Sequence, residues 1–504
     1  MNHRIRRAAS GVALIALVVA GTTPAIVRAK QPAASQTPSP LGTVGPAPTI
    51  QPNATITLAP ASQPTSLPYP AYGTPVPGVN GGIVVAGVPQ VITLDQAVAI
   101  AYAKSPSLAS ARASIQQAVG SKDETQAGLL PTLEGSGSST RTHDSNGQST
   151  TSGAYGPFNS TSNSLSVSLR QLIFDGGRTV AELRAAKFTL GAAYDTYRRA
   201  MQTVAYNVAV AYYNDLAAQR ATAIAVATVN VDLVNESLVA AQIRAGTEAK
   251  ADLATAQLST AQERVTVVRD QSTELQSEAT FANAMGLDAN TFVLPRDDTP
   301  VNGSAVPSTI PVPSYDVAFK RAVLLRPDVD AVEQEVASAR ESLRAAKLGL
   351  FPSLSGTASE ATASQNASGG AFANTGQLGV ALTVPIYDGG LTAGATKAAQ
   401  GALQLAFASQ QTTVQGVQLN VKQTLTALVS ARQAIDETRV ELAEAQIVLA
   451  STQAQFKAGV TTLPLLLNAQ VGLTQALTDQ STAVYTLRQA EQAFLYAEGA
   501  NGNS

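Results

Sequence analysis

Side chains able to carry chemistry are sparse in this sequence. It contains no Cys and only two His, His3 and His143, which lie far apart. Thiolate chemistry, a His-based catalytic triad and a His-cluster zinc site are therefore excluded. Four acidic residues stand out: Glu236, Asp252, Glu437 and Glu444. They lie on predicted helices, and no second catalytic group is seen to converge on them, so we expect them on solvated helix faces. We predict that the chain is not an enzyme and binds no cofactor or metal ion.

The charge content is low and nearly balanced. The 504 residues carry 33 Lys and Arg against 35 Asp and Glu, a formal net charge of −2. Nothing basic enough for a nucleic-acid groove stands out, so we expect no nucleic-acid partner. Charged residues make up only 13% of the chain, which is low for a soluble protein built of long helices. Helix surfaces must therefore bury small residues against one another or face something other than bulk water.

The N-terminus has the pattern of a secretory signal peptide, which we place at residues 1–29. Arg4, Arg6 and Arg7 precede an apolar run at 8–20, and small residues flank a cleavage site after Ala29. A membrane anchor is the alternative, but the apolar run is too short to span a bilayer. The absence of Cys excludes a lipidated mature N-terminus. Residues 30–90 follow as a Pro-rich segment without acidic residues, which we expect to be extended and flexible.

The rest of the chain reads as a tandem duplication of about 200 residues. The motif Phe174-Asp175-Gly176-Gly177 recurs as Tyr387-Asp388-Gly389-Gly390, and Arg244-Ala245-Gly246 recurs as Lys457-Ala458-Gly459. These and other matches fall in the same order. We place the first repeat at 91–290, a connector at 291–312, the second repeat at 313–499 and a tail at 500–504.

Each repeat shows the same succession of predicted elements. A helix, at 94–130 and 314–350, is followed by two alternating strands of about 10 residues that enclose a polar loop, at 142–163 and 360–376. Asp-Gly-Gly then ends the second strand, and a helix of some 67 residues begins, at 178–244 and 391–457. A glycine turn at Gly246 or Gly459 leads into a returning helix, which ends near Met285 or Ala497.

The second long helix carries a coiled-coil seam. Apolar residues recur at every seventh position: Phe407, Val414, Val421, Leu428, Ile435, Leu442, Leu449 and Phe456. Small residues form a second row that includes Val417, Ala431 and Ala445. The first long helix is looser, because Tyr212, Val226, Leu233 and Ala240 keep the frame whereas Gln219 interrupts it.

This geometry demands more than one chain. Four strands per chain leave open edges, and their apolar face would meet water. Closure across chains solves both problems, and a barrel of 12 strands needs three chains. The fold class we predict is mainly α with a membrane β-barrel: long coiled-coil helices form a trimeric α-barrel tunnel below a 12-stranded β-barrel with four strands from each protomer.

Over residues 91–499 the chain resembles the outer membrane factors of the TolC type. The marks are the duplication, the two Asp-Gly-Gly junctions, Arg326-Pro327-Asp328, Ala245-Gly246-Thr247 and Phe456-Lys457-Ala458-Gly459. The resemblance implies a homotrimeric channel-tunnel in outer membrane lipid that reaches into the periplasm. Such a duct works with a periplasmic adaptor and an inner-membrane transporter, and it exports drugs, metals or proteins.

The resemblance also suggests site residues. The helix tips should dock the adaptor, through Gly246, Thr247, Lys457 and Gly459. The periplasmic mouth should be closed near Glu248, Asp252, Phe456, Leu465 and Asn468. Leu465 and Asn468 occupy positions where the family pattern has aspartates, so we expect a gate closed mainly by apolar and neutral contacts.

Another departure from the family pattern lies at the first junction, where Leu172 replaces the usual Pro that Pro385 supplies in the second. We expect the chain to bend differently at these two points.

Other protein classes explain less of the pattern. A secreted or periplasmic coiled-coil structural protein would account for the heptads and the signal peptide. It would not account for alternating strands placed twice between a Pro and an Asp-Gly-Gly. A periplasmic adaptor needs one helical hairpin and not two full repeats.

Overall fold

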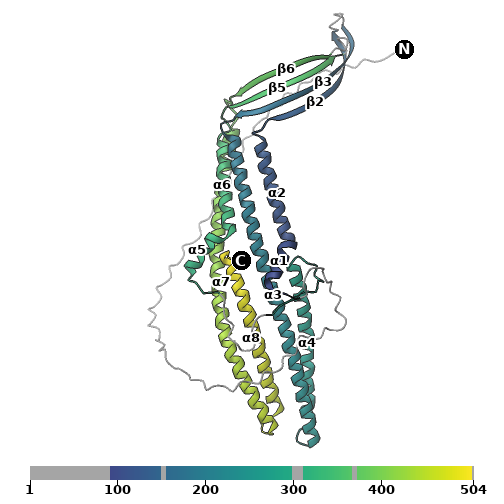
Figure 1. Ribbon diagram of the computed structural model, residues 1–504, viewed down its shortest axis with the longest axis vertical. Helices are drawn as coiled ribbons and strands as arrows, with labels where there is room; N and C mark the ends of the chain where they lie inside the picture. Colours follow the sequence, from purple (N-terminus) through teal and green to yellow (C-terminus); the bar gives the residue numbers. More distant parts are fainter. Residues whose placement is uncertain (1–90, 149–154, 298–309, 366–371, 502–504) are drawn as a thin grey trace, which may run out of the picture. The chain divides into compact units, whose positions relative to one another are not determined.

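Long antiparallel helices and one four-stranded sheet dominate the fold (Figure 1). The structure is a computed structural model that describes residues 91–148, 155–297, 310–365 and 372–501. The signal peptide expected at 1–29 and the Pro-rich segment at 30–90 lie outside the described residues. The helices are α1 (Leu94–Lys104), α2 (Pro106–Ala127), α3 (Arg178–Ala245), α4 (Lys250–Ala284), α5 (Tyr315–Leu325), α6 (Pro327–Lys347), α7 (Leu391–Lys457) and α8 (Leu463–Glu498).

The first helix of each half is broken, and the prediction of one continuous helix at 94–130 and 314–350 was wrong. Ser105 and Arg326 have extended backbones, with ψ of 123° and 117°. Each residue precedes a proline, whose ring disfavours the helical conformation of its neighbour. Pro106 and Pro327 then start α2 and α6, at a position where the missing N–H is not needed.

The long helices and their turns match the prediction closely. α3 and α7 span 68 and 67 residues, on the order of 100 Å at 1.5 Å per residue. Gly246 and Gly459 follow them with φ of 77° and 72°, a conformation that costs glycine little. The returning helices α4 and α8 have 35 and 36 residues and end within one residue of the predicted Met285 and Ala497.

The heptad seam of α7 is buried over its C-terminal two-thirds. Val421, Leu428 and Phe456 are at most 1% exposed. They pack against α8, α5 and the tip of the first hairpin. Phe407, at 42% exposure, is not covered within one chain.

In α3 the predicted frame fails toward the tip. Leu233 is 39% exposed, whereas Asp232, Asn235 and Val239 are buried. The interface there is shifted by one position relative to the apolar heptad, because polar side chains of α3 form hydrogen bonds across it.

Four strands form an antiparallel sheet in the order β2–β3–β5–β6. Their bounds are β2 (Thr132–Gln148), β3 (Tyr155–Phe174), β5 (Ser353–Gln365) and β6 (Phe372–Thr383). The strands have 12 to 20 residues, so the expected length of about 10 was too short. Much of the polar loops predicted at 142–163 and 360–376 is strand, because Ser, Thr and Asn continue the ladder where apolar alternation stops.

The two faces of the sheet differ in polarity. Directly paired residues share a face, and the pairing puts the large apolar side chains on one of them: Leu133, Leu165, Val167, Leu169, Leu354, Leu378, Val380 and Leu382. Leu378 is 89% exposed in the single chain. The opposite face carries Ser136 and Ser138, whose hydroxyls lie 2.7 and 2.8 Å from those of Ser166 and Ser164.

The helices pack in a defined lateral order. Toward the tips α4 packs on α3, α3 on α8, and α8 on α7. Toward the sheet the order is α2, α3, α6 and α7. Among the described helices only α3 has an 18-residue stretch long and apolar enough to cross a membrane, with a hydropathy of 1.4. Five other helices, α1, α2, α4, α6 and α8, pack along α3.

The start of the predicted connector belongs to the folded first half. β4 (Leu294–Pro295) lies within 291–312 and pairs in parallel with β1 (Val91–Ile92). Val293 is 1% exposed, and the Tyr212 hydroxyl donates to the Arg296 carbonyl at 2.5 Å. This pairing fixes the point at which the chain enters the described fold.

A buried carboxyl lies in the middle of α3. Asp215 is fully buried; its Oδ2 accepts from Gln219 at 3.2 Å, and its Oδ1 has no partner among the described residues. Burial, and then the nearby Glu278 and Glu274 of α4, raise the Asp215 pKa to about 8. At neutral pH the Asp215 carboxyl is therefore mostly protonated in the folded protein, whereas in the unfolded chain it ionises near pH 4.

The raised pKa predicts that Asp215→Asn stabilises the protein at neutral pH. A raised carboxyl pKa costs stability as pH rises from about 4 toward 8, and the amide removes that cost. We expect a higher thermal unfolding temperature by circular dichroism at pH 7 and a difference that shrinks toward pH 4. Asp123→Asn, on the exposed face of α2, is the control. An Asp215→Asn protein no more stable than wild type at pH 7 would contradict the assignment.

Candidate functional site: strand-to-helix junctions and helix tips

The first Asp-Gly-Gly motif is a hydrogen-bonded turn between β3 and α3. The Asp175 carboxylate accepts from the Gly177 N–H at 3.0 Å and from the Thr179 N–H at 2.7 Å. It also accepts from the Thr179 hydroxyl at 2.5 Å. The side chain thus satisfies backbone donors that a helix start leaves free and places a negative charge at the positive end of the helix dipole.

The second motif has the same geometry between β6 and α7. The Asp388 carboxylate accepts from the Gly390 N–H at 3.0 Å and from the Thr392 N–H at 2.8 Å. All four glycines have positive φ, between 69° and 91°. In both motifs the aspartate side chain and the two glycines therefore form the turn that starts the long helix.

Hydrogen bonds lower the pKa of both junction carboxyls. At Asp175, burial opposes the shift, but bonds from Thr179, Gly177 and Arg178 outweigh it. At Asp388 the hydrogen bonds from the Thr392 hydroxyl and N–H contribute most to the lowered pKa. Both groups are therefore ionised at neutral pH, and their stabilisation is lost only as pH falls through these lowered pKa values.

The two junctions differ in the strand that precedes them, as Leu172 led us to expect. β3 continues through Leu172 to Phe174, with an irregularity in its pairing to β5. β6 ends at Thr383, two residues before Pro385, which has no N–H to donate to a ladder.

The tips of both helical hairpins are open to solvent. A Cβ added at Gly246 or Gly459 would meet no atom within 4 Å. The Thr247 N–H and hydroxyl both donate to the Gln242 carbonyl at 3.0 Å and so close the first tip. Thr247 and Lys457 are exposed. The four residues expected to dock a partner are therefore accessible in one chain.

The acids expected at the mouth lie together on the first hairpin. The Asp252 carboxylate accepts from the Ala249 N–H at 3.3 Å and caps the start of α4. Partial burial, and then a hydrogen bond and repulsion from Asp252, raise the pKa of Glu248. Asp252 thus caps α4 and also lies half-buried beside a second acid.

The second hairpin presents a different surface at its start. Leu465 is 51% exposed and Asn468 is exposed, one turn further along the same face of α8. Phe456, which we expected at the mouth with them, is 1% exposed. It packs with Leu463 and Leu466 in the core of the hairpin, so it supports the tip and does not line an opening.

Sequence reasoning missed a buried polar network that ties the two hairpins together. Asp232 of α3 accepts from Ser259 of α4 at 3.2 Å and from Gln470 of α8. Gln470 also accepts from Asn235 of α3 at 2.5 Å. No spacing in the sequence marks these residues, because their partners come from three helices.

Arg326 of the Arg-Pro-Asp motif is a second buried centre. It makes two bonds to Asp328, at 3.0 and 2.6 Å, and donates to the Ala497 carbonyl at 3.3 Å. Arg199 of α3 lies 3.8 Å from Asp328 and 3.8 Å from the ring centre of Tyr496. The motif therefore joins α3, α6 and the end of α8.

Among the described residues no group of three or more His, Asp or Glu is arranged to hold a metal ion. The described geometry of these junctions and tips consists of turns, helix caps and packing contacts.

Both halves of the chain match the model of a known family. The outer membrane efflux protein family matches residues 98–287 and 318–500. The chain belongs to this family, and so to a class of outer membrane efflux channels.

Related proteins agree with this assignment. The chain is 28% identical over 348 residues to the outer membrane efflux protein BepC of Brucella suis, which covers 66% of this chain and 72% of BepC. The solved outer-membrane channel OprN superposes with a TM-score of 0.71 at 18% identity, over 81% of this chain and 90% of OprN. The CmeC outer membrane channel of Campylobacter jejuni gives 0.68 at 18% identity, over 81% and 86%.

The junction glycines offer a matched test of this local geometry. Gly176→Ala should destabilise the protein more than Gly389→Ala. Both positions have positive φ, which costs alanine roughly 1 kcal/mol. Only at Gly176 would the new Cβ also lie 2.7 Å from the Phe351 Cβ. Thermal unfolding temperatures of the two variants in the same detergent would measure the difference, and equal losses would refute the role of Phe351.

Proposed function

We propose that three copies of this chain form the outer membrane duct of an export system. The observation that carries the proposal is the β2–β3–β5–β6 sheet, which has one exposed apolar face, one polar face and two unpaired edges in a single chain. In this proposal three sheets close into a 12-stranded β-barrel, and the helices of three chains form a tunnel below it.

Closure follows from the solvent that the sheet meets. In hydrocarbon, each unpaired backbone N–H or C=O costs several kcal/mol, so an open sheet edge does not occur there. Pairing β6 of one protomer with β2 of the next satisfies both edges. The apolar face, with Leu378, Val380 and Leu382, then contacts lipid, and the serine-rich face lines a water-filled interior.

The two halves support an origin by duplication. Each runs as two short helices, two strands, a long helix and a returning helix. Each also turns through Asp-Gly-Gly with the same hydrogen bonds. We propose repeats at 91–290 and 313–499 and removal of a signal peptide, 1–29, during export to the outer membrane.

In this proposal the duct is passive. Energy would come from an inner-membrane transporter, and a periplasmic adaptor would join that transporter to the tips at Gly246 and Gly459. Small molecules such as drugs or metals, or proteins, would pass through the polar interior. A secreted coiled-coil structural protein, the other class that fits the helices, has no use for the apolar sheet face.

The mouth would be closed by unlike surfaces on the two hairpins. Leu465 and Asn468 would bring apolar and neutral contacts from the second hairpin, and Glu248 and Asp252 would bring acids from the first. A ring of Leu closes by packing and water exclusion, whereas a ring of carboxylates binds cations.

Assembly is the first test of the proposal. Because an isolated chain leaves strand edges and apolar faces uncovered, we expect a stable trimer in mild detergent and retention in outer membranes washed with high salt. Native mass spectrometry and membrane fractionation measure the two properties. A monodisperse monomer with full helix content would contradict the proposal.

The docking of a partner is tested at the second tip. Gly459→Trp should abolish export while leaving trimer and membrane insertion intact, because the tip is open and a partner backbone must approach it closely. Gly472→Trp, on the surface of α8 where a Cβ also meets no atom within 4 Å, is the control. Normal export by the Gly459→Trp protein would refute docking at this tip.

The gate predicts a specific response to cations. Block of the wild-type channel by multivalent cations in single-channel recordings should be weak, because only the first hairpin supplies acids. It should vanish in Asp252→Ala, and Leu465→Asp should introduce strong block. Tight block of the wild type that persists in Asp252→Ala would refute this account of the mouth.

A further inference from the structure

Two edge helices leave apolar stripes uncovered in the single chain. On α4, which packs along α3, the stripe consists of Leu258, Val265, Val268 and Leu275. Val265 and Val268 are 70% and 67% exposed. Each stripe follows heptad spacing, as a coiled-coil seam does.

The second stripe lies on α7, away from the face that packs on α8. It consists of Val440 and Ile447, 55% and 60% exposed, and of Ala454 one heptad further on. The polar Gln433 ends this stripe one heptad before Val440. α4 and α7 are the two outer helices of the lateral order α4, α3, α8, α7. Nothing else in the described part of one chain covers either stripe.

We propose that the α4 stripe of one protomer packs against the α7 stripe of the next, with Val268 beside Val440 and Arg269 paired with Glu441. The inference rests on the trimer of the proposed function and specifies the helix faces that hold it together. The partner is a second copy of this chain.

Contacts within one chain put the two stripes at the same level along the helices. Asp232 of α3 hydrogen-bonds Ser259 of α4 and Gln470 of α8, so Ser259 and Gln470 are level. α4 and α8 run in the same direction. Val268 and Asp479 each lie nine residues further along, about 13 Å at 1.5 Å per residue. Val268 and Asp479 are therefore level as well.

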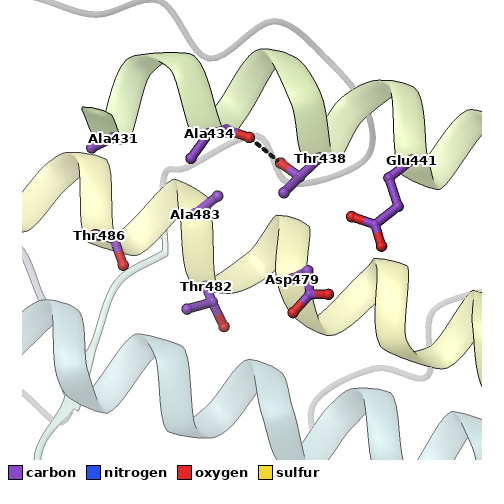
Figure 2. Close-up of a pocket in the computed structure, with 8 residues that line it drawn as sticks. All are labelled: Ala431, Ala434, Thr438, Glu441, Asp479, Thr482, Ala483 and Thr486. Atoms are coloured by element: carbon purple, nitrogen blue, oxygen red, sulfur yellow. Dashed lines mark hydrogen bonds between the residues drawn. The ribbon is translucent and has the colours of Figure 1, made fainter. Parts of the chain in front are cut away.

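An open groove of about 330 Å³ lies between α7 and α8 and is lined by residues of both helices, Glu441 and Asp479 among them. Figure 2 shows Glu441 and Asp479 at the same end of this groove. Glu441, and with it its neighbour Val440, thus lies at the level of Val268. A closed ring relates its protomers by rotation without translation, so the next protomer's α4 presents Val268 at this level too.

The charges beside the stripes are complementary. Arg269 follows Val268 on α4, and Glu441 follows Val440 on α7. In an antiparallel helix pair, the residues after two facing seam positions lie on the same side of the seam, because both helices are right-handed. Arg269 is 73% exposed, and its ion partner among the described residues is the adjacent Asp270, at 3.5 Å. Glu441 is exposed and has no ion pair within the described residues.

The absence of Cys gives a direct test. A Val268→Cys, Val440→Cys variant carries both halves of the seam in every protomer. Mild oxidation of this variant in outer membranes should yield covalent dimers and trimers on non-reducing gels. Thr266→Cys with Val440→Cys is the matched control, because Thr266 lies two residues away and is turned about 160° around α4. We expect at least tenfold less cross-linking from the control pair.

Native mass spectrometry of the same samples separates the two levels of the proposal. An intact trimer without Val268–Val440 cross-links, or with equal cross-linking from the Thr266 pair, would overturn the seam and leave the duct standing. A chain that remains monomeric in membranes and detergent would overturn the proposed trimer itself.

Charge reversal tests the ion pair separately from the apolar contact. Arg269→Glu should lower the temperature at which the trimer dissociates, and adding Glu441→Lys should restore it. Glu444→Lys, one turn from Glu441 on α7, is the control for a simple change of net charge. Equal rescue by Glu444→Lys, or none by Glu441→Lys, would refute the pair.

Discussion

The need to pair the backbone of β2 and β6 governs the rest of this structure. Each edge strand has one side on which its N–H and C=O groups pair with no strand among the described residues. Water could satisfy those groups, but the apolar face of the same sheet calls for a lipid surrounding, where water is absent. A sheet with these two properties is complete only when it closes, and four strands per chain require partners.

The helical layer, like the sheet, has edges that one chain leaves uncovered. Asp-Gly-Gly leads β3 and β6 into helices of about 100 Å, and at both junctions the aspartate side chain accepts from backbone donors at the helix start. Two helical hairpins then pack together through Asp232, Asn235 and Gln470, while α4 and α7 keep uncovered apolar stripes at the sides. In the proposed assembly, the edges of the sheet and the edges of the helical layer are covered by the same partner, a second copy of the chain.

The long helices were predicted well from the sequence because the residues that start and end a helix act locally. Asp-Gly-Gly, Gly246 and Gly459 mark ends through backbone conformations that few other residues adopt. Family membership also followed from the order of these motifs. Strand lengths were underestimated, because the outer halves of β2 and β3 are built of Ser, Thr, Asn and Gly, whose pairing depends on the neighbouring strand and not on hydrophobic alternation.

One misplaced detail could be read from the sequence: a continuous helix was predicted across Pro106, although a proline restricts the residue before it. The other two depended on partners that the sequence does not reveal. The heptad positions predicted for α3 were wrong at Leu233, because Asp232 and Asn235 are the buried residues there and form hydrogen bonds with polar groups of α4 and α8. Phe456 was assigned to the mouth on its position in the chain, whereas its contacts with Leu463 and Leu466 place it in the core.

Closure of the sheet is tested most directly by amide hydrogen exchange in native outer membranes. The account predicts that amides of β6 at Leu378, Val380 and Leu382, and of their neighbours along the strand, exchange as slowly as those of the inner strand β5, because both sides of β6 are paired. Exchange of every second amide of β6 at the rate of a solvent-exposed edge would contradict closure, and with it the duct.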